Sequence, residues 1–361
     1  MKPRDRVLTA LSFEQPDRPP FQASFTPEFA ARLRQDLNLP SDLPHDPHSG
    51  RWNGYDLEIA THQDALQCSI GWVTHYYEDT KPYVDEWGVE WVIASYQTPF
   101  GSGTYTNVSK GPLASDEALE TYHAPDPHRP ALYENLARLI REYQDDYYII
   151  GRLHTTIFET AWALRGLEPL MLDMIEDPDK AERILEIPYQ YHRVVARQMA
   201  AMGVDMIWLG DDVGSQKYMM ISPQMWRRFL KPRMATIIAE VKAINPRAKV
   251  AYHCDGNITP ILPELIEIGV DVLNPVQPES MDPASIKQQF GKRLALFGAI
   301  DVQTTLAFGS SEQVRCEVRE RMQSIGVGGG WICAPTHHIQ LDTPMSSFWA
   351  LVNAVGNPND L

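Results

Sequence analysis

The residues best suited to chemistry in this sequence form the run His253-Cys254-Asp255, which directly follows a short apolar segment. Imidazole, carboxylate and thiolate groups are the ligands that proteins use for Zn²⁺ and other divalent transition ions. If this run ends a β-strand, the alternation of side chains places His253 and Asp255 on one side and Cys254 on the other. His337 and His338 offer two further imidazoles later in the chain. We therefore predict a metal site built from His253 and Asp255 with this later histidine pair.

The same residues also have ordinary structural explanations. A free cysteine such as Cys254 is most often a small buried apolar group, and Asp255 could cap a helix that begins near Thr259. The sequence has no C-x-x-C or H-E-x-x-H motif. The metal prediction therefore depends on ligand chemistry and on the position of these residues at a strand end.

Three further carboxylates are candidates for catalysis or binding. Glu159 follows an apolar run closely enough to face inward, as a fourth ligand or as a catalytic acid, although a carboxylate at a helix start is also favoured by the helix dipole. Asp211 and Asp212 could act as a base and its partner, because adjacent carboxylates repel and one pKa can rise. The alternative for this pair is a turn that caps the helix beginning near Ser222.

Regular elements that could position these residues begin near residue 128. Short apolar runs, of the kind seen in strands buried on both faces, occupy 147–151, 206–209, 249–252, 270–274, 294–298 and 330–334. Helical segments alternate with them, at 178–202, 223–244, 260–268 and 311–325. Such alternation predicts parallel strands. Together with at least two earlier strands, one of them at 19–25, it indicates an α/β fold of the (β/α)₈ TIM-barrel type. A doubly wound open sheet is the alternative, but the glycine-rich loop typical of that fold is missing.

In a parallel barrel the functional residues gather where strands end, on one face. Polar residues follow almost every apolar run of this chain. We interpret Asp211 and Glu159 as catalytic candidates. The candidates for binding substrate or cofactor are Asp212, Gln216, Asn274 and Asp301.

We expect one domain over residues 1–361, with an irregular N-terminal part (1–110) and the main barrel at 111–361. Within the first part the sequence predicts a helix at 4–11, a second helix that starts at Pro27, and a loop at 39–55. The Trp- and Tyr-rich stretch 72–108 is typical of short antiparallel strands with turns.

Composition excludes several classes of function. The net charge is −15, which opposes non-specific binding to nucleic acid or to an anionic membrane. No apolar run approaches the roughly 18 residues of a membrane span, and the N-terminus has no signal-peptide core. The four cysteines are scattered and are expected to be reduced thiols. We therefore expect a cytoplasmic protein.

The order of several motifs resembles the uroporphyrinogen decarboxylase superfamily, which includes corrinoid-dependent methyltransferases. The matching segments are Arg4-Asp5-Arg6 with Pro16-Asp17-Arg18-Pro19-Pro20, Ser222-Pro223 with Lys231-Pro232, His253-Cys254-Asp255-Gly256-Asn257, Gly269-Val270-Asp271, Phe297-Gly298-Ala299-Ile300-Asp301, and Ala334-Pro335-Thr336-His337. The resemblance spans nearly the whole chain and implies a TIM-barrel enzyme.

The two branches of the superfamily imply different activities. Decarboxylases carry an arginine-rich segment that grips the substrate's carboxylates, whereas residues 22–29 here contain no arginine. In the methyltransferase branch, a zinc site has the pattern His-x-Cys plus a later Cys; His253 matches the histidine, while Asp255 and His337 stand where the cysteines would be. This harder ligand set favours an oxygen substrate over a thiolate.

The resemblance therefore implies a zinc-dependent methyltransferase similar to O-demethylases. It would move a methyl group between a small molecule, such as a methoxylated aromatic, and a corrinoid on a partner protein, in either direction. Family members often form dimers, which makes a homodimer a further expectation. Uroporphyrinogen decarboxylation is the alternative.

Overall fold

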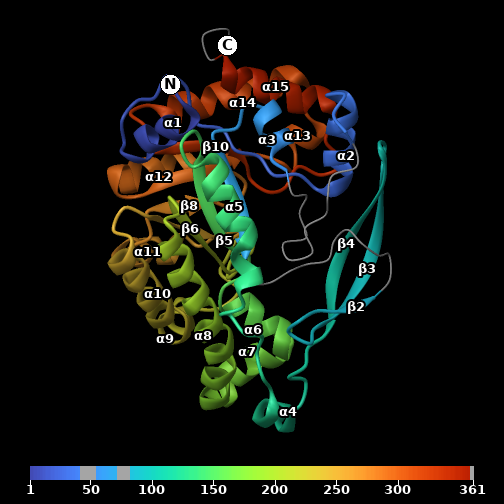
Figure 1. Ribbon diagram of the computed structural model, residues 1–361, viewed down its shortest axis with the longest axis vertical. Helices are drawn as coiled ribbons and strands as arrows, with labels where there is room; N and C mark the ends of the chain where they lie inside the picture. The colour runs from blue at the N-terminus through green and yellow to red at the C-terminus, as the bar shows by residue number, and fades with distance from the viewer. Residues whose placement is uncertain (41–53, 71–81, 358–361) are drawn as a thin grey trace.

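The main structural feature is a curled, parallel seven-stranded sheet with helices around it (Figure 1). The computed structural model describes residues 1–40, 54–70 and 82–357. The strand order is β1-β5-β6-β7-β8-β9-β10. The bounds are β1 Ala65–Ile70, β5 Tyr148–Leu153, β6 Met206–Gly210, β7 Lys249–His253, β8 Val272–Asn274, β9 Ala295–Ile300 and β10 Trp331–Pro335. Because neighbouring strands follow one another along the chain, this is the topology of a TIM-barrel-like α/β fold.

The helices that connect successive strands of this sheet pack against its outer face (Figure 1). From β5 onward they are α6 Phe158–Arg165, α7 Leu167–Glu176, α8 Pro178–Met202, α9 Pro223–Phe229, α10 Lys231–Ile244, α11 Leu262–Glu267, α12 Pro283–Phe290, α13 Thr305–Phe308, α14 Ser311–Arg321 and α15 Met345–Gly356. The segment predicted as one helix at 223–244 is interrupted at Leu230, where Pro232 cannot donate a backbone hydrogen bond. The predicted alternation of strands and helices is confirmed.

Apolar side chains fill both sides of the sheet, which explains why the strands read as continuous apolar runs. One buried cluster lies inside the curl and includes Tyr148, Ile150, Met206, Trp208 and Phe297. A larger cluster lies between the sheet and the helices. Every residue of β5, β6, β9 and β10 is buried. A strand buried on both faces has no polar side to alternate with.

The segment predicted as a first strand at 19–25 does not form a regular strand. It makes isolated parallel bridges, Phe21 with Cys333 and Phe25 with Ile339. The Cys333 amide donates to the Pro20 carbonyl at 2.8 Å, and the Asp64 amide donates to the Phe21 carbonyl at 2.8 Å. The segment therefore lies between β10 and the start of β1. The described residues form seven regular strands in this sheet, one fewer than predicted.

The N-terminal part (1–110) contributes one regular strand, β1, to the sheet, and β1 pairs in parallel with β5; the sequence predicts a second early strand without locating it. The antiparallel strands predicted within 72–108 are present as β2 Tyr83–Val84, β3 Glu90–Thr98 and β4 Gly101–Lys110, although 71–81 lie outside the described residues. The β3–β4 hairpin projects beside the main body (Figure 1).

The helices that precede β5 are α1 Pro3–Leu11, α2 Pro27–Asp36 and α3 Asp56–Ala60 in the N-terminal part, followed by α4 Asp116–Thr121 and α5 Glu134–Tyr143. The first two match the helices predicted at 4–11 and from Pro27. Most of the predicted loop 39–55 lies outside the described residues. Among the helices described here, none is both long and apolar enough to span a membrane.

Candidate functional site

The main candidate site is a cluster of three side chains, Asp212, His253 and Asp255, at the carboxyl ends of two neighbouring strands. One possible ligand atom from each lies within 4.8 Å of the others. The His253 Nε2 atom is 3.9 Å from an oxygen of Asp212 and 3.9 Å from an oxygen of Asp255. The sequence analysis predicts His253 and Asp255 as metal ligands, whereas it assigns Asp212 to the binding of substrate or cofactor.

Strand register and two glycines bring these residues together. His253, the last residue of β7, is paired with Gly210, the last residue of β6, so Asp212 and Asp255 both stand two residues beyond adjacent strand ends. The loops that follow touch through glycine: a Cβ on Gly214 would lie 2.5 Å from the Asp255 carbonyl oxygen. Gly256 has a φ of +78°, which favours glycine. The Asp255 amide then donates to Asp212 Oδ1 at 2.7 Å.

Asn274, the last residue of β8, determines which nitrogen of His253 carries a proton. Its Nδ2 donates to the Phe297 carbonyl oxygen at 2.8 Å. Because a carbonyl only accepts, the other atom of the amide, Oδ1, must face His253 Nδ1, at 2.5 Å. Nδ1 therefore donates its hydrogen to Asn274. In the neutral ring, Nε2 then has its lone pair directed at the two carboxylates.

This arrangement brings three electron-rich groups, one imidazole nitrogen and two carboxylates, close to one another. Asp255 Oδ1 is buried and has no hydrogen-bond partner. Burial raises the pKa of Asp255, the charge of Asp212 raises it further, and His253 and His337 oppose the shift. Ligands of a tetrahedral ion with bonds of about 2.0–2.1 Å lie roughly 3.3 Å apart. The two separations of 3.9 Å between His253 Nε2 and the carboxylates need to shorten by only about 0.6 Å, so the donor set fits a divalent cation.

His337, the third predicted ligand, lies beside this cluster. It follows β10 by two residues and lines the same cavity, but its ring nitrogens are not part of the group of atoms within 4.8 Å. The residue is exposed, yet desolvation of its ring by neighbouring atoms lowers the pKa of His337, whereas the nearby Asp255 carboxylate acts in the opposite direction. Its ring packs against His338 with centroids 5.1 Å apart. His337 is close enough to interact electrostatically with the cluster.

Glu159, in the first turn of α6, lines the cavity as predicted for an inward-facing acid. Its Oε2 accepts a hydrogen bond from the Asp212 amide at 3.2 Å. Burial raises the pKa of Glu159 well above its ordinary value, and the charges of Asp212 and Asp211 add to the effect. The side chain is therefore suited to holding a proton beside the cluster.

Asp211, a predicted catalytic residue, has hydrogen-bond partners in the backbone. The residue is fully buried, and its carboxylate accepts hydrogen bonds at 3.0 Å from the amides of Ile157 and Glu159. Burial raises its pKa to about 7, against these donors. Asp211 thus satisfies amides at the start of α6. The turn therefore caps α6 instead of the helix near Ser222, and the catalytic assignment of Asp211 stays a prediction.

Two other predicted binding residues also have structural partners. The buried Asp301 carboxylate accepts amide hydrogen bonds from Gln303 at 2.8 Å and Thr304 at 3.1 Å, as well as the Thr304 hydroxyl. It therefore holds the turn before α13. Gln216 is exposed and donates to Gln303 at 3.3 Å. Neither Asp301 nor Gln216 is among the described residues that line the cavity at the cluster, and their assignment to binding stays a prediction.

Cys254 is fully buried, as expected for the residue that alternates away from the cluster. Its Sγ accepts a hydrogen bond from the Val213 amide at 3.3 Å. Burial raises the pKa of this thiol well above its ordinary value. These features favour a structural role.

The cavity beside the cluster has a volume of about 130 Å³. Its lining includes residues that the sequence did not assign to the site, namely Gln22, Ser24, Gln67, Arg152, His154, Trp208, Thr336 and His338. Arg152 and His154 stand at the end of the strand predicted at 147–151. This position at a strand end is the feature by which the sequence could have identified them as site residues. Gln67 was missed together with β1, because polar residues interrupt that strand.

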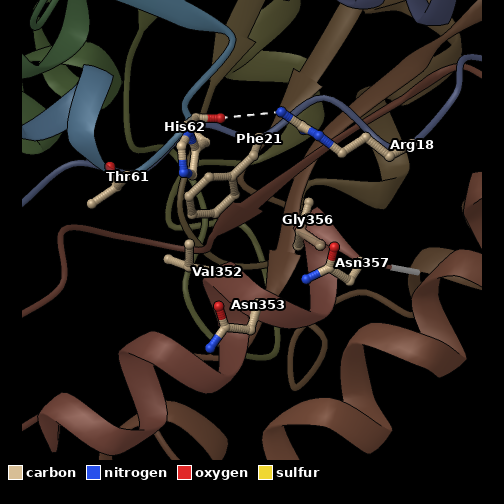
Figure 2. Close-up of a pocket in the computed structure, with 9 residues that line it drawn as sticks. Arg18, Phe21, Thr61, His62, Val352, Asn353, Gly356 and Asn357 are labelled. Carbon is tan, nitrogen blue, oxygen red and sulfur yellow. Dashed lines mark hydrogen bonds between the residues drawn. The ribbon is translucent and has the colours of Figure 1, made fainter. Parts of the chain in front are cut away.

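A larger cavity, of about 370 Å³, lies near the opposite ends of the strands (Figure 2). Its lining includes Arg18, whose guanidinium donates to the His62 carbonyl, and residues of α15 such as Asn353. Among the described residues that line it, none is a carboxylate. Conserved chemistry in TIM barrels sits at the carboxyl ends of strands, so the smaller cavity remains the candidate site.

Comparison with known proteins gives the family. Residues 95–357 match the family described as Uroporphyrinogen decarboxylase (URO-D). The chain belongs to this family. It is 29% identical over 270 residues to a uroporphyrinogen decarboxylase from Nitrosococcus oceani, covering 71% of this chain and 73% of the relative.

The chain is also similar to methyltransferases of the same superfamily. It is 23% identical over 218 residues to a methylated-thiol–coenzyme M methyltransferase from Methanosarcina mazei, covering 60% of this chain. The match spans about half of that relative's length, 55%. A solved structure of a methyltransferase from Methanosarcina mazei aligns with a TM-score of 0.72 at 22% identity and covers 99% of both chains. This likeness supports the TIM-barrel-like fold over the whole chain.

Proposed function

We propose that this protein is a metal-dependent methyltransferase that moves a methyl group between a small oxygen-containing substrate and a corrinoid bound to a partner protein. The observation that carries the proposal is the cluster of Asp212, His253 and Asp255, with an imidazole lone pair aimed at two carboxylates. The similarity to methyltransferases of the family supports the same reaction class.

The chain's own residues can hold and tune a metal. Asp212, His253 and Asp255 would bind the ion, with His337 near enough to join them, and Asn274 fixes the imidazole orientation. A bound Zn²⁺ ion would act as a Lewis acid on the substrate oxygen. Two carboxylates and imidazole form a harder site than thiolates, which favours an ether or hydroxyl oxygen.

Glu159 has a role that follows from its raised pKa. Removal of the methyl group breaks a carbon–oxygen bond and leaves the electron pair on the oxygen. A carboxylic acid with a raised pKa keeps its proton to higher pH than an ordinary glutamate and can donate it to that oxygen. Glu159 lines the cavity beside Asp212 and meets this requirement.

Decarboxylation of uroporphyrinogen is the second candidate, because the family description and the Nitrosococcus relative favour it. That substrate carries many carboxylates, so its site needs several cations. Among the described residues that line the cavity, Arg152 is the one arginine or lysine, whereas Glu159 and Asp212 add negative charge. This electrostatic balance opposes a polyanion.

Metal analysis followed by activity measurement tests the proposal. We expect about one zinc per chain, lost in His253→Ala, and formation of methylcobalamin from cob(I)alamin with a methoxylated aromatic. The Cys254→Ala variant is the control and should keep the metal. Metal-free protein that releases carbon dioxide from uroporphyrinogen would overturn the proposal in favour of the second candidate.

A further inference from the structure

One side of the cavity, away from the metal cluster, carries a positive charge. Arg152, in β5, is 7% exposed and lines the cavity. Its guanidinium carbon lies 4.8 Å from the centre of the Trp208 ring, and its Nη1 donates to Gln67 Oε1 at 3.3 Å. These contacts with an aromatic ring and a neutral amide fix the position of a planar cation.

The strand register relates Arg152 to the cluster. Arg152 is paired with Trp208 on β6, and Trp208 is paired with Ala251 on β7. His253 stands two residues further along β7, so Arg152 lies one layer deeper in the curled sheet. The Trp208 and His253 rings stack, with centroids 5.6 Å apart and an interplanar angle of 26°. Trp208 therefore forms a flat surface between the cation and the cluster.

The other groups near Arg152 are hydrogen-bonding side chains. Gln22, Ser24 and Gln67 line the same cavity. The cavity thus combines an acidic side at Glu159 and Asp212 with a positive side at Arg152.

We propose that the substrate is a small monocarboxylate whose carboxylate group binds Arg152. The inference rests on the proposed function in one respect, since the methyl-bearing oxygen would face the cluster across the Trp208 surface. The guanidinium fork matches a carboxylate in a bidentate geometry. One arginine suits a single charge, and a cavity of about 130 Å³ is small compared with pockets for drug-sized ligands.

Binding of matched acid and amide probes tests this proposal without any methyl transfer. The probes are 4-methoxybenzoate with 4-methoxybenzamide, and the smaller methoxyacetate with 2-methoxyacetamide, measured by calorimetry on the full chain. We expect an acid to bind at least tenfold more tightly than its amide. Arg152→Met should abolish this preference, and Arg152→Lys should keep part of it.

Two controls separate Arg152 from other causes. Arg293 is exposed on the loop before β9, at the opposite ends of the strands, so Arg293→Met removes the same charge and should leave the preference unchanged. The preference should also persist after a chelator removes metal, because a carboxylate bound only to the ion would lose it. If Arg152→Met does not fold, the wild-type preference in chelator and the Arg152→Lys variant still decide.

Failure of this proposal is distinguishable from failure of the proposed function. Equal binding of acid and amide, no binding of either acid, or an unchanged preference in Arg152→Met would overturn the carboxylate proposal even if the protein transfers methyl groups. A clear acid preference in a protein that transfers no methyl group would support it and contradict the proposed function.

Discussion

Replacement of Asn274 by leucine should weaken metal binding although Asn274 is not a ligand in the proposed site. The substitution keeps a side chain of similar size but removes the acceptor for His253 Nδ1 and the donor to the Phe297 carbonyl. The side chain of His253 is 17% exposed, so water replaces the lost partner poorly. The ring is then free to carry its proton on Nε2, which would block the lone pair aimed at Asp212 and Asp255.

The size of the effect follows from these lost contacts. Loss of a partner that orients a histidine ligand costs about 10- to 100-fold in metal affinity, or roughly 1.4–2.7 kcal/mol. The Phe297 carbonyl, left without its donor, should lower the free energy of unfolding by about 1–3 kcal/mol in addition. Competition with a chromophoric chelator measures the Zn²⁺ affinity, and urea denaturation measures the stability.

Asn257→Leu is the matched control. Asn257 also makes two hydrogen bonds, from its Nδ2 to the Ser280 carbonyl and from the Thr259 amide to its Oδ1, both at 3.0 Å. Neither bond involves His253. This variant should lose stability but keep its affinity for Zn²⁺. Equal affinities in the Asn274→Leu variant and the wild type would refute the proton assignment of His253.

Three further predictions concern the carboxylates. Asp212→Asn should lower Zn²⁺ affinity at least tenfold, whereas Asp301→Ala should leave it unchanged and cost about 0.5–2 kcal/mol of stability as a lost cap; chelator competition and urea denaturation check both. Asp211→Asn should destabilise the protein by about 1–3 kcal/mol and retain one zinc per chain by elemental analysis; loss of the metal with unchanged stability would contradict its capping role. Because the folded protein keeps the Glu159 proton at pH values where the unfolded chain has lost it, the unfolding free energy of metal-free protein should fall as pH rises from the ordinary glutamate pKa toward the raised one. Denaturation across this range should show a smaller fall in Glu159→Gln, and identical slopes would count against the raised pKa.

The sequence missed β1 for a physical reason. Its run Ala65–Ile70 contains Gln67 and Ser69, and Gln67 is buried because it lines the cavity and contacts Arg152. A buried polar residue at the cavity therefore broke the apolar pattern that revealed the other strands. The segment at 19–25 is predicted as a strand because it is apolar. Its residues pack between β10 and β1 through isolated bridges and do not form a regular strand.

The sequence by itself determined the alternation of strands and helices, because strands buried on both faces must be apolar throughout. It also determined that polar residues gather at the strand ends, and that Cys254 points away from His253 and Asp255. Only the tertiary structure decided which of two adjacent aspartates faces the cluster. Asp211 turns toward the amides that begin α6, whereas Asp212 meets Asp255 across two loops in contact. Such choices depend on the register of neighbouring strands and on contacts between distant loops, which local sequence patterns do not encode.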